Sequence, residues 1–134
     1  MKKINTALLS FGMSGRVFHA PFIHLHEGFE LLGSWERSNK TIQQNYPSVK
    51  SYNSLEAILN DDAVELVIVN TPTYTHFEYA EKALQAGKHI VVEKAFTTTV
   101  AEAEALKALA IKQNKQISVF QNRRWDSDFK TVKK

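Results

Sequence analysis

Residues 6–15 read TALLSFGMSG, and this stretch decides the fold that the rest of the chain must satisfy. The run from Thr6 to Leu9 is apolar enough for a parallel strand that is buried on both faces. Gly12 and Gly15 then predict a turn, and a short helix is expected after it. A strand that passes through a tight turn into a helix is the first unit of an alternating α/β domain.

The same alternation continues along the chain. Hydrophobic and β-branched runs predict five further strands, at residues 29–35, 49–52, 64–69, 89–93 and 117–120. Helices are predicted between them, at residues 41–45, at 55–59, after Thr75 and after Thr99. This order requires right-handed crossovers and a parallel sheet covered on both faces, so we expect one doubly wound α/β domain over residues 1–134.

The expected helix ends carry recognisable residues. Three pairs have the spacing of a capping box: Asn53 with Glu56, Thr75 with Glu78, and Thr99 with Glu102. Gly87 is placed to end the helix after Thr75, because glycine readily takes the left-handed C-terminal position. In the last long helix, helical spacing turns four side chains inward: Val100, Ala103, Leu106 and Ala110.

The composition is that of an ordinary globular domain, with 43% hydrophobic and 23% charged residues. Cysteine is absent, which excludes disulfides and thiolate metal sites and favours a reducing, cytoplasmic location. The net charge of +3 arises in the tail, because residues 112–134 carry seven Lys or Arg and two Asp. We therefore expect no nucleic-acid face. We also expect no metal site at His19, His24 and His26, because their spacing does not place them together and no acidic ligands join them. No stretch is long enough to predict a membrane span.

Residues Ser10 to Gly15 follow the dinucleotide fingerprint G-x-G-x-x-G, with serine at the first glycine. Gly12 would let the backbone approach a pyrophosphate, and Gly15 would let the helix pack closely on the strand. The amides at the helix start would bind phosphate oxygens. Cofactor contacts are therefore predicted for Phe11, Gly12, Met13, Ser14, Gly15, Arg16 and Val17, although an ordinary turn also explains two glycines.

An acidic residue is expected about 20 residues after such a loop, where it binds the adenosine ribose. Glu36 has this position at the end of the second predicted strand and favours NAD, because a carboxylate repels the 2′-phosphate of NADP. Arg37 and Ser38 would bind that phosphate instead, so the preference stays open. A solvated surface pair is the simpler interpretation of Glu36 and Arg37.

Further candidates follow the later strands at the same edge. Glu93 and Lys94 end the fifth predicted strand, and a lysine there would exchange a proton with a substrate hydroxyl, unless it simply reaches solvent. Thr71, Pro72 and Thr73 would border the nucleotide. His76 is either a cleft residue or an ordinary polar residue at a helix end. After the last strand come Asn122, Arg124 and Trp125, which would contact cofactor or substrate or else form a basic surface loop.

Four strings in order resemble the Gfo/Idh/MocA family of NAD(P)-dependent oxidoreductases over the whole chain: Ser14 to Phe22, Thr71-Pro72 with His76, Ala86 to His89 leading to Glu93-Lys94, and Gln121 to Phe129. The last string is most similar to the branch that contains scyllo-inositol dehydrogenases. The resemblance implies a Rossmann fold that binds NAD or NADP, and hydride transfer at a CH–OH group of a sugar or polyol. It also implies that Lys94 is the catalytic lysine.

The same resemblance implies a homo-oligomer and a longer parent enzyme, because family members continue into a second α/β domain that supplies most of the substrate pocket. We therefore expect this chain to be the N-terminal part, inactive by itself. It departs from the family at Ala95, where the family has proline, and at Ser10. Two alternatives stay open: a nucleotide-sensing module without catalysis, and an interaction protein that binds no nucleotide.

Overall fold

The computed structural model describes residues 2–121 and Val132. Within this part of the chain, six strands form one parallel sheet in the order β3-β2-β1-β4-β5-β6. The strands are β1 (Ile4–Leu8), β2 (Phe29–Trp35), β3 (Lys50–Tyr52), β4 (Leu66–Val69), β5 (His89–Glu93) and β6 (Ile117–Phe120). The order reverses between β1 and β4, so the predicted doubly wound sheet is confirmed, and its switch point lies beside the glycine-bearing turn.

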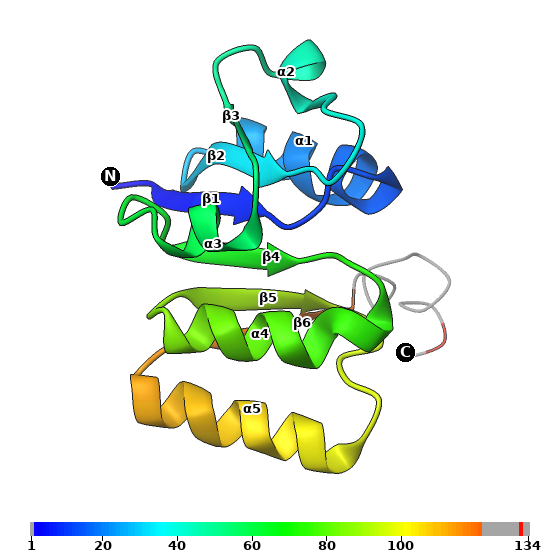
Figure 1. Cartoon of the computed structure of the whole chain (residues 1–134), viewed down its shortest axis with the longest axis vertical. Helices are drawn as coiled ribbons and strands as arrows, with labels where there is room; N and C mark the ends of the chain where they lie inside the picture. Colours follow the sequence, from blue (N-terminus) through cyan, green and yellow to red (C-terminus); the bar gives the residue numbers. More distant parts are fainter. Residues whose placement is uncertain (1, 122–131, 133–134) are drawn as a thin grey trace.

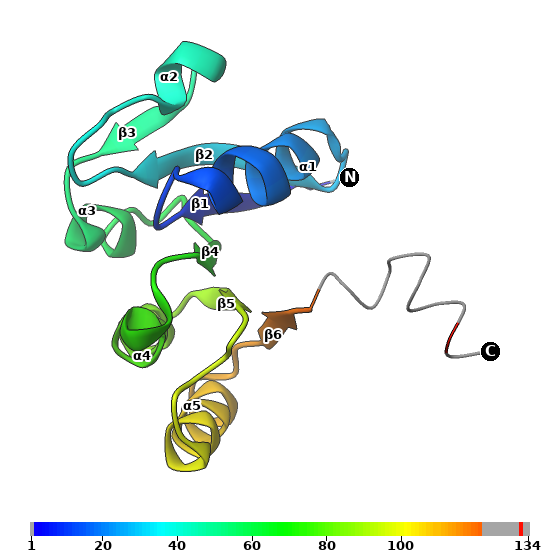
Figure 2. The same cartoon turned by 90° about the vertical axis from the view of Figure 1, so that its right-hand side faces the viewer.

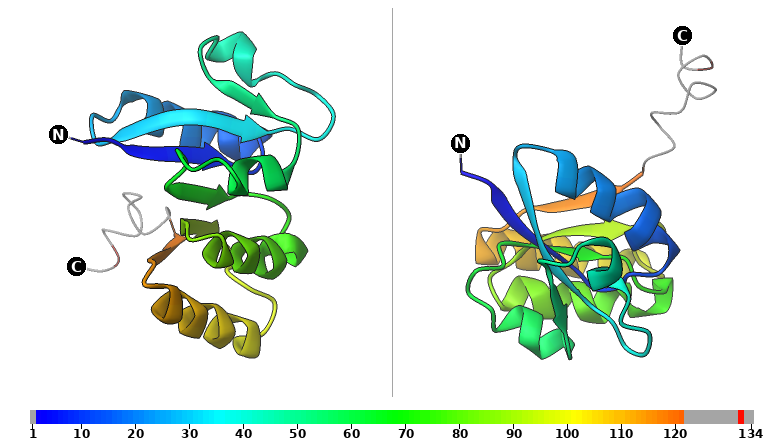
Figure 3. Two further views of the ribbon diagram at one scale, coloured as in Figure 1. Left: turned by 60° about the vertical axis from the view of Figure 1, so that its left-hand side comes forward. Right: turned by 90° about the horizontal axis from the view of Figure 1, so that it is seen from above.

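Helices connect the strands: η1 (Ser14–His19), α1 (Ala20–Leu25), α2 (Ile42–Asn45), α3 (Leu55–Leu59), η2 (Thr73–Thr75), α4 (His76–Gln85) and α5 (Val100–Gln113). The short helix expected after Gly15 is present as the π-helical η1, which runs on into α1. Figures 1 and 2 show α4 and α5 beside β4, β5 and β6. Seen from above, in the right-hand view of Figure 3, α1 and α4 lie on opposite sides of the sheet.

The alternation of side chains along β1 divides the core in two. Ala7 faces the core beneath α3, α4 and α5, whereas Leu8 faces the core beneath α1 and α2. Both side chains are fully buried, as is Leu9. The strand is therefore apolar on both faces because each face is covered, as its sequence predicted.

The helix ends confirm some predictions and correct others. Thr99 caps α5 by accepting from the Glu102 amide at 3.1 Å, and Gly87 has the left-handed φ of 79°. Asn53 does not cap α3, because the neighbouring Ser54 accepts from the Ala57 amide at 3.0 Å.

Two further expectations about α4 and α5 were wrong. The Thr75 hydroxyl does not cap α4, because it donates to the Pro72 carbonyl at 2.6 Å and so closes the preceding η2 turn. Val100 is 74% exposed. It stands in the first turn of α5, while the buried side of that helix runs through Leu106 and Ala110.

Among the described residues, none of the helices combines the length and the apolar character needed to cross a membrane.

Candidate functional site

The loops that follow the parallel strands meet at one edge of the sheet. The labelled arrows of β1, β2, β4 and β5 point the same way in Figure 1, so their carboxyl ends face this edge together. Two hollows open here, with volumes of about 380 and 370 Å³. We call them the Arg37 hollow and the Lys94 hollow, and the loop after β1 contributes residues to both.

The loop after β1 depends on Gly15 for its close approach to η1. A Cβ atom built on Gly15 would lie 2.5 Å from the Ser10 carbonyl oxygen and 3.2 Å from the Asn70 amide nitrogen, so a side chain does not fit there. Gly12 is different, because its Cβ would meet nothing closer than the Ser10 hydroxyl at 3.6 Å. That hydroxyl accepts from the Gly12 amide at 3.3 Å, so the serine in place of the family's glycine takes part in the turn.

Asn70 connects the end of β4 to this loop. Its side-chain amide donates to the Ser10 carbonyl at 2.8 Å and to the Ser14 hydroxyl at 3.3 Å, and its oxygen accepts from the Leu9 amide at 3.2 Å. The residue is buried and lines the Lys94 hollow. In the sequence, the segment from Asn70 to Thr73 follows a predicted strand and so belongs to the ligand-binding edge, but nucleotide contacts were predicted only from Thr71 onward.

The Arg37 hollow combines aromatic, cationic and polar groups. Its lining comprises Ser10, Phe11, Gly12, Arg16, Trp35, Glu36, Arg37, Ser38, Asn39 and Thr41. The Arg37 guanidinium carbon lies 4.3 Å from the centre of the Trp35 ring, within the range of a cation–π contact. Its Nη2 donates to the Tyr79 hydroxyl at 3.3 Å, so two aromatic residues position this cation.

Glu36 does not present its carboxylate to the hollow as a free acceptor. The side chain is buried, with 6% exposure. Its Oε2 accepts from the Thr41 amide at 2.6 Å, and its Oε1 accepts from the Ile42 amide at 3.2 Å and from the Ser51 hydroxyl at 3.4 Å. The first amides of a helix have no partner within it, and here the carboxylate supplies one to the start of α2. The predicted ribose contact would require these bonds to break.

The Lys94 hollow lies at the ends of β4 and β5. Its lining comprises Met13, Ser14, Phe18, Asn70, Thr71, Glu93, Lys94 and Phe120. Lys94 is exposed to solvent at this edge. Its neighbour Glu93 contacts a buried side chain, because His19 Nε2 lies 2.5 Å from Glu93 Oε1. The His19 ring also packs on the Phe120 ring, with 4.5 Å between the ring centres. No pattern in the sequence predicts this pair, because its members stand 74 residues apart.

His76 lies beneath the site and not in its opening. The side chain is 1% exposed, so it does not open into the cleft, and it stands at the first position of α4, at a helix end. Its Nε2 lies 2.8 Å from the Thr71 carbonyl oxygen, and its Nδ1 lies 2.8 Å from the Ala95 carbonyl oxygen. The ring therefore ties the segment after β4 to the segment after β5, including Ala95, where the family has proline.

The two hollows bring together eleven of the residues predicted from the sequence: Phe11, Gly12, Met13, Ser14, Arg16, Glu36, Arg37, Ser38, Thr71, Glu93 and Lys94. Five others do not line either hollow: Gly15, Val17, Pro72, Thr73 and His76. Gly15 and His76 support the loops from below, whereas Val17 and Pro72 are exposed. Asn122, Arg124 and Trp125 lie outside the described residues.

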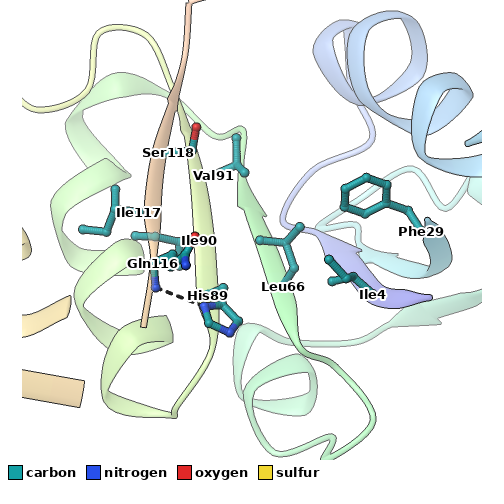
Figure 4. A pocket seen from close by; sticks show the side chains of 9 residues that line it. All are labelled: Ile4, Phe29, Leu66, His89, Ile90, Val91, Gln116, Ile117 and Ser118. Atoms are coloured by element: carbon teal, nitrogen blue, oxygen red, sulfur yellow. Dashed lines mark hydrogen bonds between the residues drawn. The ribbon is translucent and has the colours of Figure 1, made fainter. Parts of the chain in front are cut away.

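A third hollow, of about 350 Å³, opens on the face of the sheet (Figure 4). Its lining is mostly apolar and includes Ile4, Phe29, Leu66 and Val91. The His89 ring accepts from the Gln116 amide at 3.0 Å, drawn as a dashed line in Figure 4. Because it offers few polar groups that could orient a ligand, we place the site's chemistry at the carboxyl edge.

Comparison with known proteins agrees with this geometry. Residues 4–121 match the model of an oxidoreductase family with an NAD-binding Rossmann fold. The chain belongs to this family, known as Gfo/Idh/MocA. The similarity predicted from its four sequence strings is thereby confirmed.

Individual relatives cover nearly all of the chain. It is 40% identical to scyllo-inositol 2-dehydrogenase (NADP(+)) IolW of Bacillus subtilis, over 98% of its own length and 37% of the relative's. A presumed oxidoreductase from Bacteroides fragilis has a TM-score of 0.94 at 49% identity, matching 99% of this chain and 41% of that one. Biliverdin reductase from Synechocystis, solved with biliverdin and NADP+, has a TM-score of 0.89 at 25% identity over 97% of this chain and 42% of that one. The chain thus spans well under half the length of these relatives.

Proposed function

We propose that this chain is the coenzyme-binding part of an oxidoreductase that transfers a hydride between NAD(P) and a CH–OH group of a sugar or polyol. One observation carries the proposal: Lys94 and the glycine-bearing loop, from β5 and β1, line the same hollow. The Bacillus subtilis relative is a scyllo-inositol 2-dehydrogenase, which supports the polyol class of substrate. Assembly into a homo-oligomer remains a prediction from the family resemblance.

The residues present fit a dinucleotide. Gly12 is exposed, and a Cβ there would meet the Ser10 hydroxyl at 3.6 Å and no other atom within 4 Å, so the backbone can approach a pyrophosphate. Backbone amides at the start of η1 that have no partner within the helix would donate to the phosphate oxygens. Residues of the Arg37 hollow would hold the adenosine part, and Met13, Ser14 and Thr71 would border the nicotinamide part.

The bound nicotinamide would supply the hydride acceptor or donor. Lys94 would take the hydroxyl proton as an alcohol is oxidised and return it in the reverse direction. Glu93, held by His19, would fix the strand end from which Lys94 projects, and His76 would fix the segment beyond it. These contacts position the lysine without covering it, because Lys94 itself is exposed.

A titration of NADH and of NADPH into the 134-residue chain, followed by nicotinamide fluorescence, tests the coenzyme site. We expect saturable binding. Gly12→Val should abolish it without unfolding the chain, because a Cβ at this position makes only an ordinary contact, with the Ser10 hydroxyl at 3.6 Å, while the added methyl groups block the approach of the pyrophosphate. Gly28→Ala, at the opposite edge of the sheet before β2, is the matched control and should bind normally. If neither nucleotide binds the unaltered chain, the proposal is contradicted.

The catalytic role of Lys94 is tested in the enzyme that carries this chain. Lys94→Ala should lower kcat on a polyol substrate by roughly 100-fold or more, the usual contribution of a general acid–base group. The dissociation constant for the coenzyme should change less than twofold, since the pyrophosphate loop is untouched. Unchanged turnover would instead favour a nucleotide-sensing module in which the lysine has no chemical role.

A further inference from the structure

We infer that the Arg37 hollow selects NADP(H) over NAD(H), with Arg37 and Ser38 as the specificity-determining residues for the 2′-phosphate. This inference rests on the proposed function and adds the choice of coenzyme to it. It reverses the preference for NAD that Glu36 suggested from the sequence. Three observations lead to it: the bonds of Glu36, the position of Arg37 and the charge of the hollow.

The carboxylate of Glu36 is used in hydrogen bonds within the protein. An acidic residue excludes a 2′-phosphate when its oxygens face the ribose and accept from its hydroxyls. Here both carboxylate oxygens accept bonds from protein groups, among them the amides of Thr41 and Ile42. Together with burial, these bonds occupy the carboxylate oxygens and oppose any rotation toward a ribose.

Arg37 is preorganised to meet an anion. Its guanidinium lies against the Trp35 ring at 4.3 Å and donates to the Tyr79 hydroxyl, while the side chain remains exposed. A guanidinium that uses one of its donors in this way keeps others for a phosphate. The stacked arrangement means that little side-chain freedom is lost on binding.

The charge of the hollow is suited to a phosphate. Its lining carries two cations, Arg16 and Arg37, and the carboxylate of Glu36, whose oxygens accept from protein groups. In the part of the chain that the structure describes, neither arginine has a carboxylate within 4.0 Å. The hydroxyl of Ser38 and the amide of Asn39 add hydrogen-bonding groups beside Arg37. A 2′-phosphate brings about 1.5 to 2 negative charges at neutral pH, and the two guanidinium groups would attract them.

The test compares dissociation constants of NADPH and NADH for the 134-residue chain, and of 2′,5′-ADP and 5′-AMP as probes without nicotinamide. We expect NADPH and 2′,5′-ADP to bind roughly tenfold or more tighter than their partners at low salt. This ratio should fall as NaCl is raised, because the added attraction is electrostatic. Arg37→Ala should bring the ratio close to one.

Two further variants separate the inference from its rivals. Lys50→Ala removes the same charge outside the hollow and should leave the ratio unchanged. Glu36→Gln keeps an oxygen acceptor for α2, and the inference predicts little change in the ratio. A ratio of one or below in the unaltered chain, or a tenfold rise of the ratio in Glu36→Gln, overturns the inference while the proposed function stands. Binding of none of the four probes overturns both.

Discussion

Glu36 and Glu93 each stand at the carboxyl end of a strand at the same edge of the sheet, yet they are held in different ways. The partners of Glu36 include the amides of Thr41 and Ile42, five and six residues ahead. The partner of Glu93 is His19, which lies 74 residues earlier in the sequence. The first acid braces its own loop, whereas the second joins two distant elements.

This difference separates two uses of an acidic residue at a ligand edge. Glu36 satisfies the start of a helix, so its carboxylate is occupied before any ligand arrives. Glu93 pairs with one buried ring and lies beside Lys94, so its bond bears on the position of a reacting group. The position in a sequence motif therefore predicts where an acidic side chain lies, whereas its hydrogen-bond partners determine whether its carboxylate is available to a ligand.

The largest loss of stability is expected from removing the hydrogen bonds between Glu36 and the amides at the start of α2. Glu36→Ala leaves the Thr41 and Ile42 amides without their acceptor, and Ile42 is fully buried. Unpaired buried amides cost about 1–3 kcal/mol each, so the free energy of unfolding should fall by about 3 kcal/mol. Urea denaturation measures it. Glu36→Gln should recover part of the loss, and a loss below about 0.5 kcal/mol in the alanine variant would show that the brace is dispensable.

A smaller loss is expected from breaking the distant pair. His19→Ala removes one hydrogen bond and the ring contact with Phe120, but Glu93, at 14% side-chain exposure, can regain some water. We expect the free energy of unfolding to fall by about 2 kcal/mol. His19→Gln, which keeps a side-chain donor, is the matched variant and should lose less. If the two variants were equally unstable, the bond to Glu93 would contribute nothing beyond the ring's packing.

Much of the fold was predictable because its signals are local. The β-branched and apolar runs gave the bounds of β2, β5 and β6, and the bounds of β1, β3 and β4 within two residues. The cap of α3 was assigned to Asn53 and not to Ser54, because adjacent polar residues satisfy the same pattern. Val100 was expected inside because helical spacing does not reveal where a helix passes beyond its neighbours.

The site was predictable in position but not in detail. Glycine spacing and strand ends located the loop of Gly12, the Arg37 segment and Lys94 at one edge. The direction of the Glu36 carboxylate was missed, since the spacing from a glycine motif carries no information about its hydrogen-bond partners. The buried position of His76 and the pairing of His19 depend on contacts between segments far apart in the sequence, which only the folded chain brings together.

The smallest loss of stability is expected at a third carboxylate, Asp61, which lies outside the site. Its variant serves as a reference for the losses expected at Glu36 and His19. The Tyr52 hydroxyl donates to Asp61 at 2.7 Å, and this bond is the main cause that lowers the pKa of Asp61 below its ordinary value of 3.8. A lowered pKa means that the folded state favours the ionised acid, so this stabilisation is present above pH 3.8 and is lost as the pH falls below it. Tyr52→Phe should therefore cost about 1 kcal/mol at pH 7 and less near pH 2, measured by urea denaturation at both values.

Nucleotide binding should be unaffected by Tyr52→Phe, because neither Tyr52 nor Asp61 lines either hollow at the carboxyl edge. Glu36→Ala should weaken binding together with stability, since the loop it braces carries Arg37 and Ser38. If Tyr52→Phe weakened binding as much, the loss in Glu36→Ala would reflect general loosening of the fold. If it did not, the carboxylate of Glu36 acts on the coenzyme through the loop that it holds.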